Sequence, residues 1–170
     1  MRSLIVIILI SLIATPCDAQ TPEQNLEKMG ITLPKLKKPG GIYLTWRKAG
    51  NMLYIAGMSC RCELKGKVGK DLTLEQGQEA ARLAGLNILA IIKDALGDLS
   101  MVKQFIRVEG MVSSAPDFYD QPKVINAFSG LMRDVFGEKG MHTRAAIGQA
   151  VLPGNTPVEI VVTLELEQID

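Results

Sequence analysis

The residues best suited to chemistry lie near the carboxyl end of the sequence. Arg144 is followed by mostly small or apolar residues, which places its guanidinium at a strand mouth or in a pocket. There it can bind a planar carboxylate through two parallel hydrogen bonds. Glu159 lies in an apolar segment, where a carboxylate is costly unless it is paired or functional, and it can polarise a water. The structural alternatives stay open: Arg144 at the surface, and Glu159 pointing outward from a strand.

Most other kinds of catalytic site are excluded by the absence of their motifs. The sequence has a single histidine, no metal-ligand spacing, no glycine-rich phosphate loop and no G-x-S-x-G. A site that works by positioning remains, and neither a metal nor a cofactor is predicted. His142, two residues before Arg144, can relay a proton there or simply be a solvated loop residue. The net charge of +1 and 5% aromatic content argue against a nucleic-acid partner.

The first nineteen residues are typical of a secretory signal peptide. Arg2 is followed by an apolar run over residues 4–14 and by the small-residue pattern Cys17-Asp18-Ala19. A membrane-spanning helix needs about 20 apolar residues, so the run is short for a span, although a retained anchor stays open. Cleavage after Ala19 predicts an exported protein, periplasmic or secreted, with no membrane association once the signal is removed.

Two cysteines, Cys60 and Cys62, remain beyond the signal segment. Side chains separated by one residue in a strand point to opposite faces, so a disulfide between these two would be strained. Two cysteines without a second pair do not form a zinc site. We therefore expect two half-buried free thiols, and a disulfide between subunits stays open.

For the remaining chain, the sequence predicts an extended lead-in over residues 20–40 and a single domain over residues 41–170. Within the domain the period of the apolar residues separates strands from helices. Thr73 with Gln76 forms a capping box, and Gly97 is a natural helix end. The predicted strands cover residues 43–46, 52–58, 102–113, 143–152 and 158–166, and the predicted helices start at Thr73 and Asp120.

This ββαβαββ order indicates an α+β fold. We expect a mixed, mostly antiparallel sheet with both helices on one face. The other face is then predicted to be apolar at Leu53, Ile55, Ile106 and Val108, and at several positions of residues 158–166. Because an uncovered apolar face favours self-association, the chain is expected to form an oligomer.

Residues 140–162, GMHTRAAIGQAVLPGNTPVEIVV, resemble the signature of the Rid family, also called YjgF, in a less-characterised branch with HTR and LPGNTPVE. The family's arginine, its Leu-Pro and its Val-Glu-Ile strand correspond here to Arg144, Leu152-Pro153 and Val158-Glu159-Ile160. The resemblance extends over residues 41–168. Its upstream parts are Gly41-Ile42-Tyr43, Gly50-Asn51-Met52, Ala56-Gly57-Met58 and Val124-Ile125-Asn126.

The resemblance implies a chorismate-mutase-like subunit that forms a homotrimer with sites between subunits. It also implies hydrolysis of reactive enamines and imines to 2-oxo acids and ammonia, with Arg144 holding the substrate carboxylate and Glu159 orienting the water. The implied substrate-binding residues are Tyr43, Gly57, Asn126 and Ala146, the last standing where better-known members often have cysteine. A non-catalytic protein that binds small carboxylates, or an interaction protein, on the same scaffold is the alternative.

Overall fold

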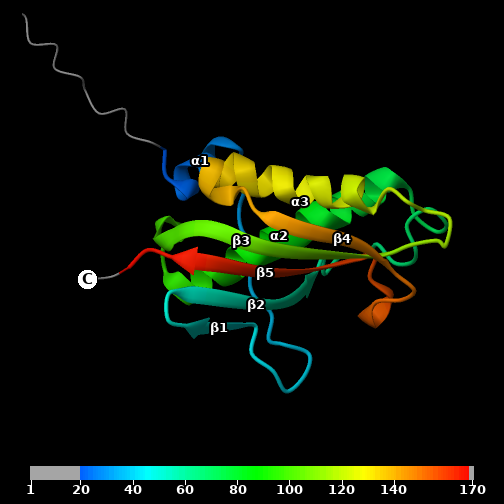
Figure 1. Ribbon diagram of the computed structural model, residues 1–170, viewed down its shortest axis with the longest axis horizontal. Helices are drawn as coiled ribbons and strands as arrows, with labels where there is room; N and C mark the ends of the chain where they lie inside the picture. Colours follow the sequence, from blue (N-terminus) through cyan, green and yellow to red (C-terminus); the bar gives the residue numbers. More distant parts are fainter. Residues whose placement is uncertain (1–19, 169–170) are drawn as a thin grey trace, which may run out of the picture.

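The computed structural model describes residues 20–168 and has the predicted α+β architecture (Figure 1). A five-stranded sheet has the order β1-β2-β5-β3-β4, in which only the β3–β4 pair is parallel. Helices α2 and α3 pack together on one face of it. The strands are β1 (Trp46–Ala49), β2 (Met52–Ser59), β3 (Val102–Ser113), β4 (Thr143–Gln149) and β5 (Val158–Leu166); the long helices are α2 (Leu74–Leu96) and α3 (Gln121–Phe136).

The predicted signal segment lies outside the described residues. Among the helices of residues 20–168, none combines the length and the apolar character that crossing a membrane requires.

Local sequence signals set the ends of α2 and of the first hairpin. The Thr73 hydroxyl caps α2, Gln76 completes the capping box, and Gly97 ends the helix in the left-handed conformation at φ 75°. Ala49 pairs with Met52, so only two residues form the β1–β2 turn. Such a turn fixes the register, and the first strand therefore lies directly before it rather than at residues 43–46.

The predicted extended lead-in is wrong for residues 22–28, which form helix α1 (Pro22–Lys28). Thr21 and Gln24 make a capping box, and the proline at the first helical position supplies a preset φ. Leu26 is buried in the core, and the Asn25 side chain donates to the Val135 carbonyl at the end of α3. The segment is therefore part of the packed domain.

The face of the sheet that α2 and α3 leave uncovered, here called the open face, differs from its prediction. Leu53, Ile55 and Val108 are at most 2% exposed and belong to the core beneath the helices. In β5 the even-numbered residues are the buried ones, and the three residues pair with Leu164 and Val162 on that side. The alternation of side chains along a strand does not say which of its two faces is buried, and the packing of α2 and α3 decides this.

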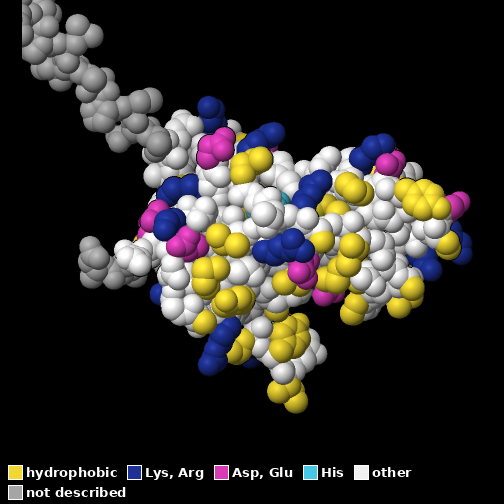
Figure 2. Space-filling view, viewed as in Figure 1, with side chains coloured by type: hydrophobic (Ala, Val, Ile, Leu, Met, Phe, Trp, Pro, Cys, Tyr) yellow, Lys and Arg dark blue, Asp and Glu magenta, His cyan; other side chains and the backbone are white. Residues whose placement is uncertain are grey.

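The open face carries both apolar and charged side chains. Tyr54 and Arg107 pair with Thr163 of β5, Glu109 pairs with Val161, and Ile147 pairs with Met111, which is the partner of Glu159. These residues and Val161 itself therefore lie on the open face, as the odd-numbered residues of β5 do. In the view of Figures 1 and 2 the sheet lies in front of α2, and hydrophobic side chains there are interspersed with basic and acidic ones. This face is suited to contacts that combine apolar packing with specific charge pairs.

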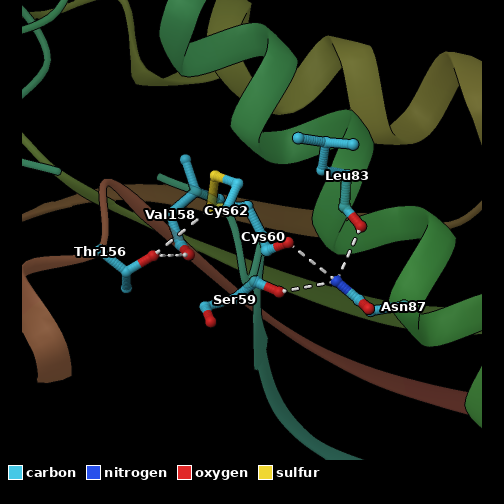
Figure 3. The surroundings of a disulfide bond; sticks show 7 residues. All are labelled: Ser59, Cys60, Cys62, Leu83, Asn87, Thr156 and Val158. Atoms are coloured by element: carbon cyan, nitrogen blue, oxygen red, sulfur yellow. Dashed lines mark hydrogen bonds between the residues drawn. A yellow bond between two sulfur atoms is a disulfide. The ribbon is translucent and has the colours of Figure 1, made fainter. Parts of the chain in front are cut away.

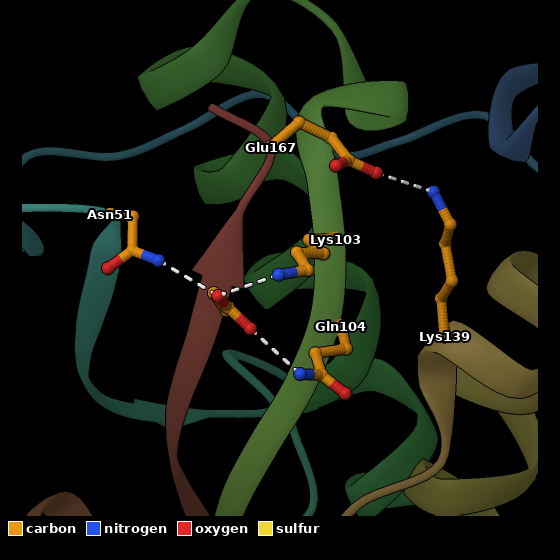
Figure 4. A network of polar contacts seen from close by, with 6 residues as sticks. Asn51, Lys103, Gln104, Lys139 and Glu167 are labelled. Carbon is orange, nitrogen blue, oxygen red and sulfur yellow. Dashed lines mark hydrogen bonds and ion pairs between the residues drawn. The ribbon is translucent and has the colours of Figure 1, made fainter. Parts of the chain in front are cut away.

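A polar network fixes the end of β5 (Figure 4). The Glu165 carboxylate accepts hydrogen bonds from the side chains of Asn51 at 2.8 Å, Lys103 at 3.0 Å and Gln104 at 2.7 Å. The Gln104 amide, followed by Lys103, lowers the pKa of Glu165 because these donors favour the ionised form. The carboxylate thereby joins the β1–β2 turn, β5 and β3.

Candidate functional site

Glu159 and Gly57 lie side by side on neighbouring strands. Glu159 pairs with Ser59 of β2 and with Met111 of β3, and an irregularity in β2 between Ile55 and Met58 shifts the register beside it. A Cβ added at Gly57 would overlap the Glu159 carboxylate oxygen and would lie 2.9 Å from its Cδ. The missing side chain at Gly57 therefore gives the Glu159 carboxylate its place.

These two residues border a cavity of about 860 Å³, here called the Glu159 cavity. Tyr43 also lines it, from the loop before β1, so the structure brings together three of the predicted site residues. Met58 and Ser59 line the same cavity from β2. A carboxylate in such a cavity can accept a proton from a bound water and orient its attack.

Arg144 lies on β4 and is held by one stripe of α3. Its guanidinium donates to the Ser129 hydroxyl at 2.9 Å, to the Asn126 side-chain oxygen at 2.7 Å and to the Pro122 carbonyl at 3.3 Å. The three acceptors follow one another at spacings of four and three residues, which places them on one helix face. Asn126 thus lies beside Arg144, and the half-buried arginine keeps N–H groups that can bind a ligand carboxylate.

Within one chain the structure does not bring Arg144 and Glu159 together. Arg144 pairs with Val108, which pairs with Val162, and Val162 is buried on the helix-covered face. Glu159 lies three residues before Val162 and therefore points to the open face. Ala146 shares the face of Arg144 and packs against the core, so the predicted residues form two groups on opposite faces of the sheet.

His142 and Ser129 extend the arginine group. The His142 Nδ1 lies 2.8 Å from the Gly140 carbonyl, and its Nε2 lies 3.0 Å from the Ser129 hydroxyl. Since a carbonyl only accepts, Nδ1 donates to it, and the Ser129 hydroxyl then donates to Nε2 while accepting from Arg144. Burial, with a further contribution from the charge of Arg144, lowers the pKa of His142. Both ring nitrogens of the histidine therefore have hydrogen-bond partners, and the lowered pKa favours the neutral ring.

Sequence reasoning did not identify Ser129. The available signal was its position three residues after Asn126, on the same face of a predicted helix. Among residues 20–168 no group of three or more histidine, cysteine or acidic side chains is arranged to hold a metal ion.

Cys60 and Cys62 form a disulfide, which corrects the expectation of two free thiols (Figure 3). The expectation assumed a strand, but β2 ends at Ser59 and the cysteines lie in the loop beyond it. Arg61 takes the left-handed conformation at φ 51°, which brings both cysteine side chains to one side of the backbone with their Cα atoms 5.2 Å apart.

A buried asparagine fixes this loop to α2. The Asn87 side chain donates to the carbonyls of Ser59 at 3.2 Å, Cys60 at 3.0 Å and Leu83 at 3.1 Å (Figure 3). The end of β2 and the disulfide loop are therefore held against the helix that covers the sheet.

Comparison with known proteins supports the fold and identifies the family. Residues 23–166 match the family described as "YjgF/chorismate mutase-like, putative endoribonuclease". A structure of a protein of unknown function from Agrobacterium tumefaciens is 39% identical, with a TM-score of 0.79 over 87% of this chain and 93% of that one. A protein from Shewanella oneidensis, described as "a putative endoribonuclease", is 32% identical, with a TM-score of 0.83 over 86% of this chain and 100% of its own.

A curated relative is Protein TCP17 of Trypanosoma cruzi. It is 36% identical over 147 residues, which cover 84% of this chain and 92% of the relative. The similarity thus covers most of this chain and most of the relative. The chain belongs to the YjgF/chorismate-mutase-like family.

Proposed function

We propose that the protein hydrolyses imines and enamines derived from amino acids to 2-oxo acids and ammonia, in clefts between the subunits of a homotrimer. Proteins of this family are typically trimers that bind small ligands. The observation that carries the proposal is the division of Arg144 and Glu159 between opposite faces of one sheet. Each is positioned by its own chain, and β4 is an edge strand that a second subunit can approach.

The chemistry requires only positioning groups. Arg144 binds the substrate carboxylate, which fixes the imine carbon relative to the water held by Glu159. That carbon is already electrophilic, so no covalent nucleophile is needed. As the water oxygen bonds to the carbon, Glu159 accepts its proton; the C–N bond then breaks, the nitrogen takes up protons and ammonia leaves. One imine and one water thus give one 2-oxo acid and one ammonia.

The deciding experiment measures imine loss and 2-oxo acid binding with purified protein and freshly generated 2-imino acids. Arg144→Lys keeps the charge but loses the planar fork, so binding of 2-oxo acids should weaken about ten- to a hundredfold. Glu159→Gln should keep binding while imine hydrolysis falls by about a hundredfold or more. If the wild type binds 2-oxo acids without accelerating imine loss, the proposal fails and a non-catalytic carboxylate-binding function replaces it.

We also propose that the protein is exported and begins near Gln20 after cleavage. The sequence pattern of residues 1–19 motivates this, and a Cys60–Cys62 disulfide is compatible with an oxidising compartment. The mass of the exported protein tests the cleavage site, and an intact Met1 in the cytosolic fraction would contradict it. Light scattering tests the trimer, which a stable monomer at micromolar concentration would exclude.

A further inference from the structure

The lining of the Glu159 cavity is strongly basic. Lys37, Lys38, Arg61 and Lys65 line this cavity, whereas Glu159 is the single acidic residue among the described residues that line it. In the part of the chain that the structure describes, none of these four cations takes part in an ion pair. Basic side chains that share a concave surface without acidic partners attract anionic ligands.

Arg61 is the most constrained of the four. It lies between the two disulfide-bonded cysteines with φ at 51°, and its Nη1 donates to the Lys37 carbonyl at 3.3 Å. The Asn87 side chain holds the adjacent Ser59 and Cys60 carbonyls. The backbone on its amino-terminal side is thus fixed to α2, and the disulfide closes the loop on its other side. An arginine held in this way loses less conformational entropy when it binds an anion than a free surface side chain does.

The size of the cavity leaves room for more than a three-carbon imino acid. Its volume of about 860 Å³ is within the range of roughly 300–1,000 Å³ found for sites that take much larger ligands. A substrate whose reacting carbon lies at Glu159 can therefore extend toward the basic residues that line the same cavity.

We propose that these basic residues form a second anion-binding subsite, centred on Arg61, which selects substrates carrying a second negative group, a carboxylate or a phosphate, at the end remote from the imine. The inference rests on the proposed function in one respect, that the reacting end lies at Glu159 in the same cavity. Arg144 holds the carboxylate next to the reacting carbon. Arg61, with Lys37 and Lys65 beside it, then holds the remote anion.

The test compares ligands that differ only in the second charge. Binding of 2-oxopentanedioate and 2-oxopentanoate, which share a five-carbon chain, is measured by titration calorimetry on the wild type. Phosphate is distinguished from carboxylate by comparing 3-phosphonooxy-2-oxopropanoate with 3-hydroxy-2-oxopropanoate. In at least one pair, the member that carries the second anionic group should bind about tenfold more tightly, as expected for one charge-assisted contact that is partly exposed to water.

Charge-neutralising variants then locate the subsite. Arg61→Gln should remove most of the tenfold preference while changing affinity for the singly charged ligand less than about twofold. Lys70→Gln is the matched control, since Lys70 is an exposed residue of the same loop outside the cavity lining, and its preference should equal that of the wild type. Arg61→Lys should keep part of the preference that Arg61→Gln loses, because lysine keeps the positive charge but lacks the planar fork of the guanidinium. A thermal melt verifies that each variant is folded.

Equal affinity for both members of both pairs would overturn the proposal, and so would a preference that Arg61→Gln leaves unchanged. Tight binding of an RNA oligonucleotide without any preference among the small ligands would also overturn it, since the basic residues would then bind a polyanion. These outcomes are separate from those for the proposed function. A charge preference without imine hydrolysis would support the subsite and refute the proposed deaminase function. Imine hydrolysis without a charge preference would support the deaminase function and refute the subsite.

Discussion

Replacing Gly57 by alanine tests whether the position of Glu159, rather than its mere presence, matters for the proposed hydrolysis. The new Cβ would overlap the carboxylate oxygen and would lie 2.9 Å from Cδ and 3.2 Å from Cγ. These atoms belong to the end of a flexible side chain, so the carboxylate can move away while the backbone stays. A displacement of about 1 Å at a reacting group can cost roughly a hundredfold in rate. We therefore expect Gly57→Ala to slow imine hydrolysis by about that factor.

The stability of Gly57→Ala should barely change. Replacing glycine in a strand gains about 0.5–1 kcal/mol of backbone entropy, and an off-rotamer glutamate costs about 0.5–1.5 kcal/mol. The net effect lies within about 1 kcal/mol of zero, or a shift in Tm of at most about 4 °C for a chain of this size. Gly140→Ala is the contrast, because its Cβ would overlap the backbone carbonyl of Met132, which cannot turn away. That variant should lose stability instead, by about 1–3 kcal/mol.

A double-mutant cycle on imine hydrolysis decides whether Gly57 acts through Glu159. If it does, Gly57→Ala combined with Glu159→Gln should be no slower than Glu159→Gln alone, since one function cannot be lost twice. Multiplicative losses in the double variant would refute the reasoning. So would full activity of Gly57→Ala, since the carboxylate would then not need its observed place.

Two further predictions concern the groups that hold the site. Asn87→Ala removes a buried side chain and leaves the carbonyls of Ser59 and Cys60 without their hydrogen-bond donor. Urea unfolding should therefore show a loss of about 1–3 kcal/mol in the free energy of unfolding. An unchanged urea midpoint would contradict the anchoring role of Asn87. Burial lowers the pKa of His142, so the unfolded chain binds the proton more readily and stability falls as the pH drops below about 6.5. Thermal melts between pH 7.5 and pH 5 should therefore show a smaller acid-induced loss for His142→Gln, and equal losses would refute the assignment.

Local signals account for the elements that sequence reasoning placed correctly. The capping residue Thr73 and the terminal Gly97 act within one helical turn, and the strand over 158–166 shows its period of two directly. Helix α1 had an equally local signal at Thr21 and Gln24, but the prolines and lysines of residues 20–40 outweighed it. The capping signal of α1 was therefore present in the sequence, although the surrounding composition favoured an extended segment.

Other features depend on contacts between distant segments and have no local signal. The face on which Leu53 lies is decided by where α2 and α3 pack, since strand alternation alone allows both faces. The disulfide depends on β2 ending at Ser59 and on the left-handed Arg61, neither of which the Cys-x-Cys spacing specifies. The place of Arg61 beside the Glu159 cavity follows from the same loop path.

The family resemblance indicated Arg144 and Glu159 as functional residues, and the structure adds how each is positioned. Arg144 is set by the stripe of α3 that includes Asn126 and Ser129, and Glu159 is set by the room that Gly57 leaves. Both groups are complete within one chain, although they lie on opposite faces of its sheet. Assembly then has to supply only the approach of two surfaces that are already ordered, so little further conformational entropy is lost when the proposed site forms. A single chain, by the same geometry, cannot hold one small substrate with both groups.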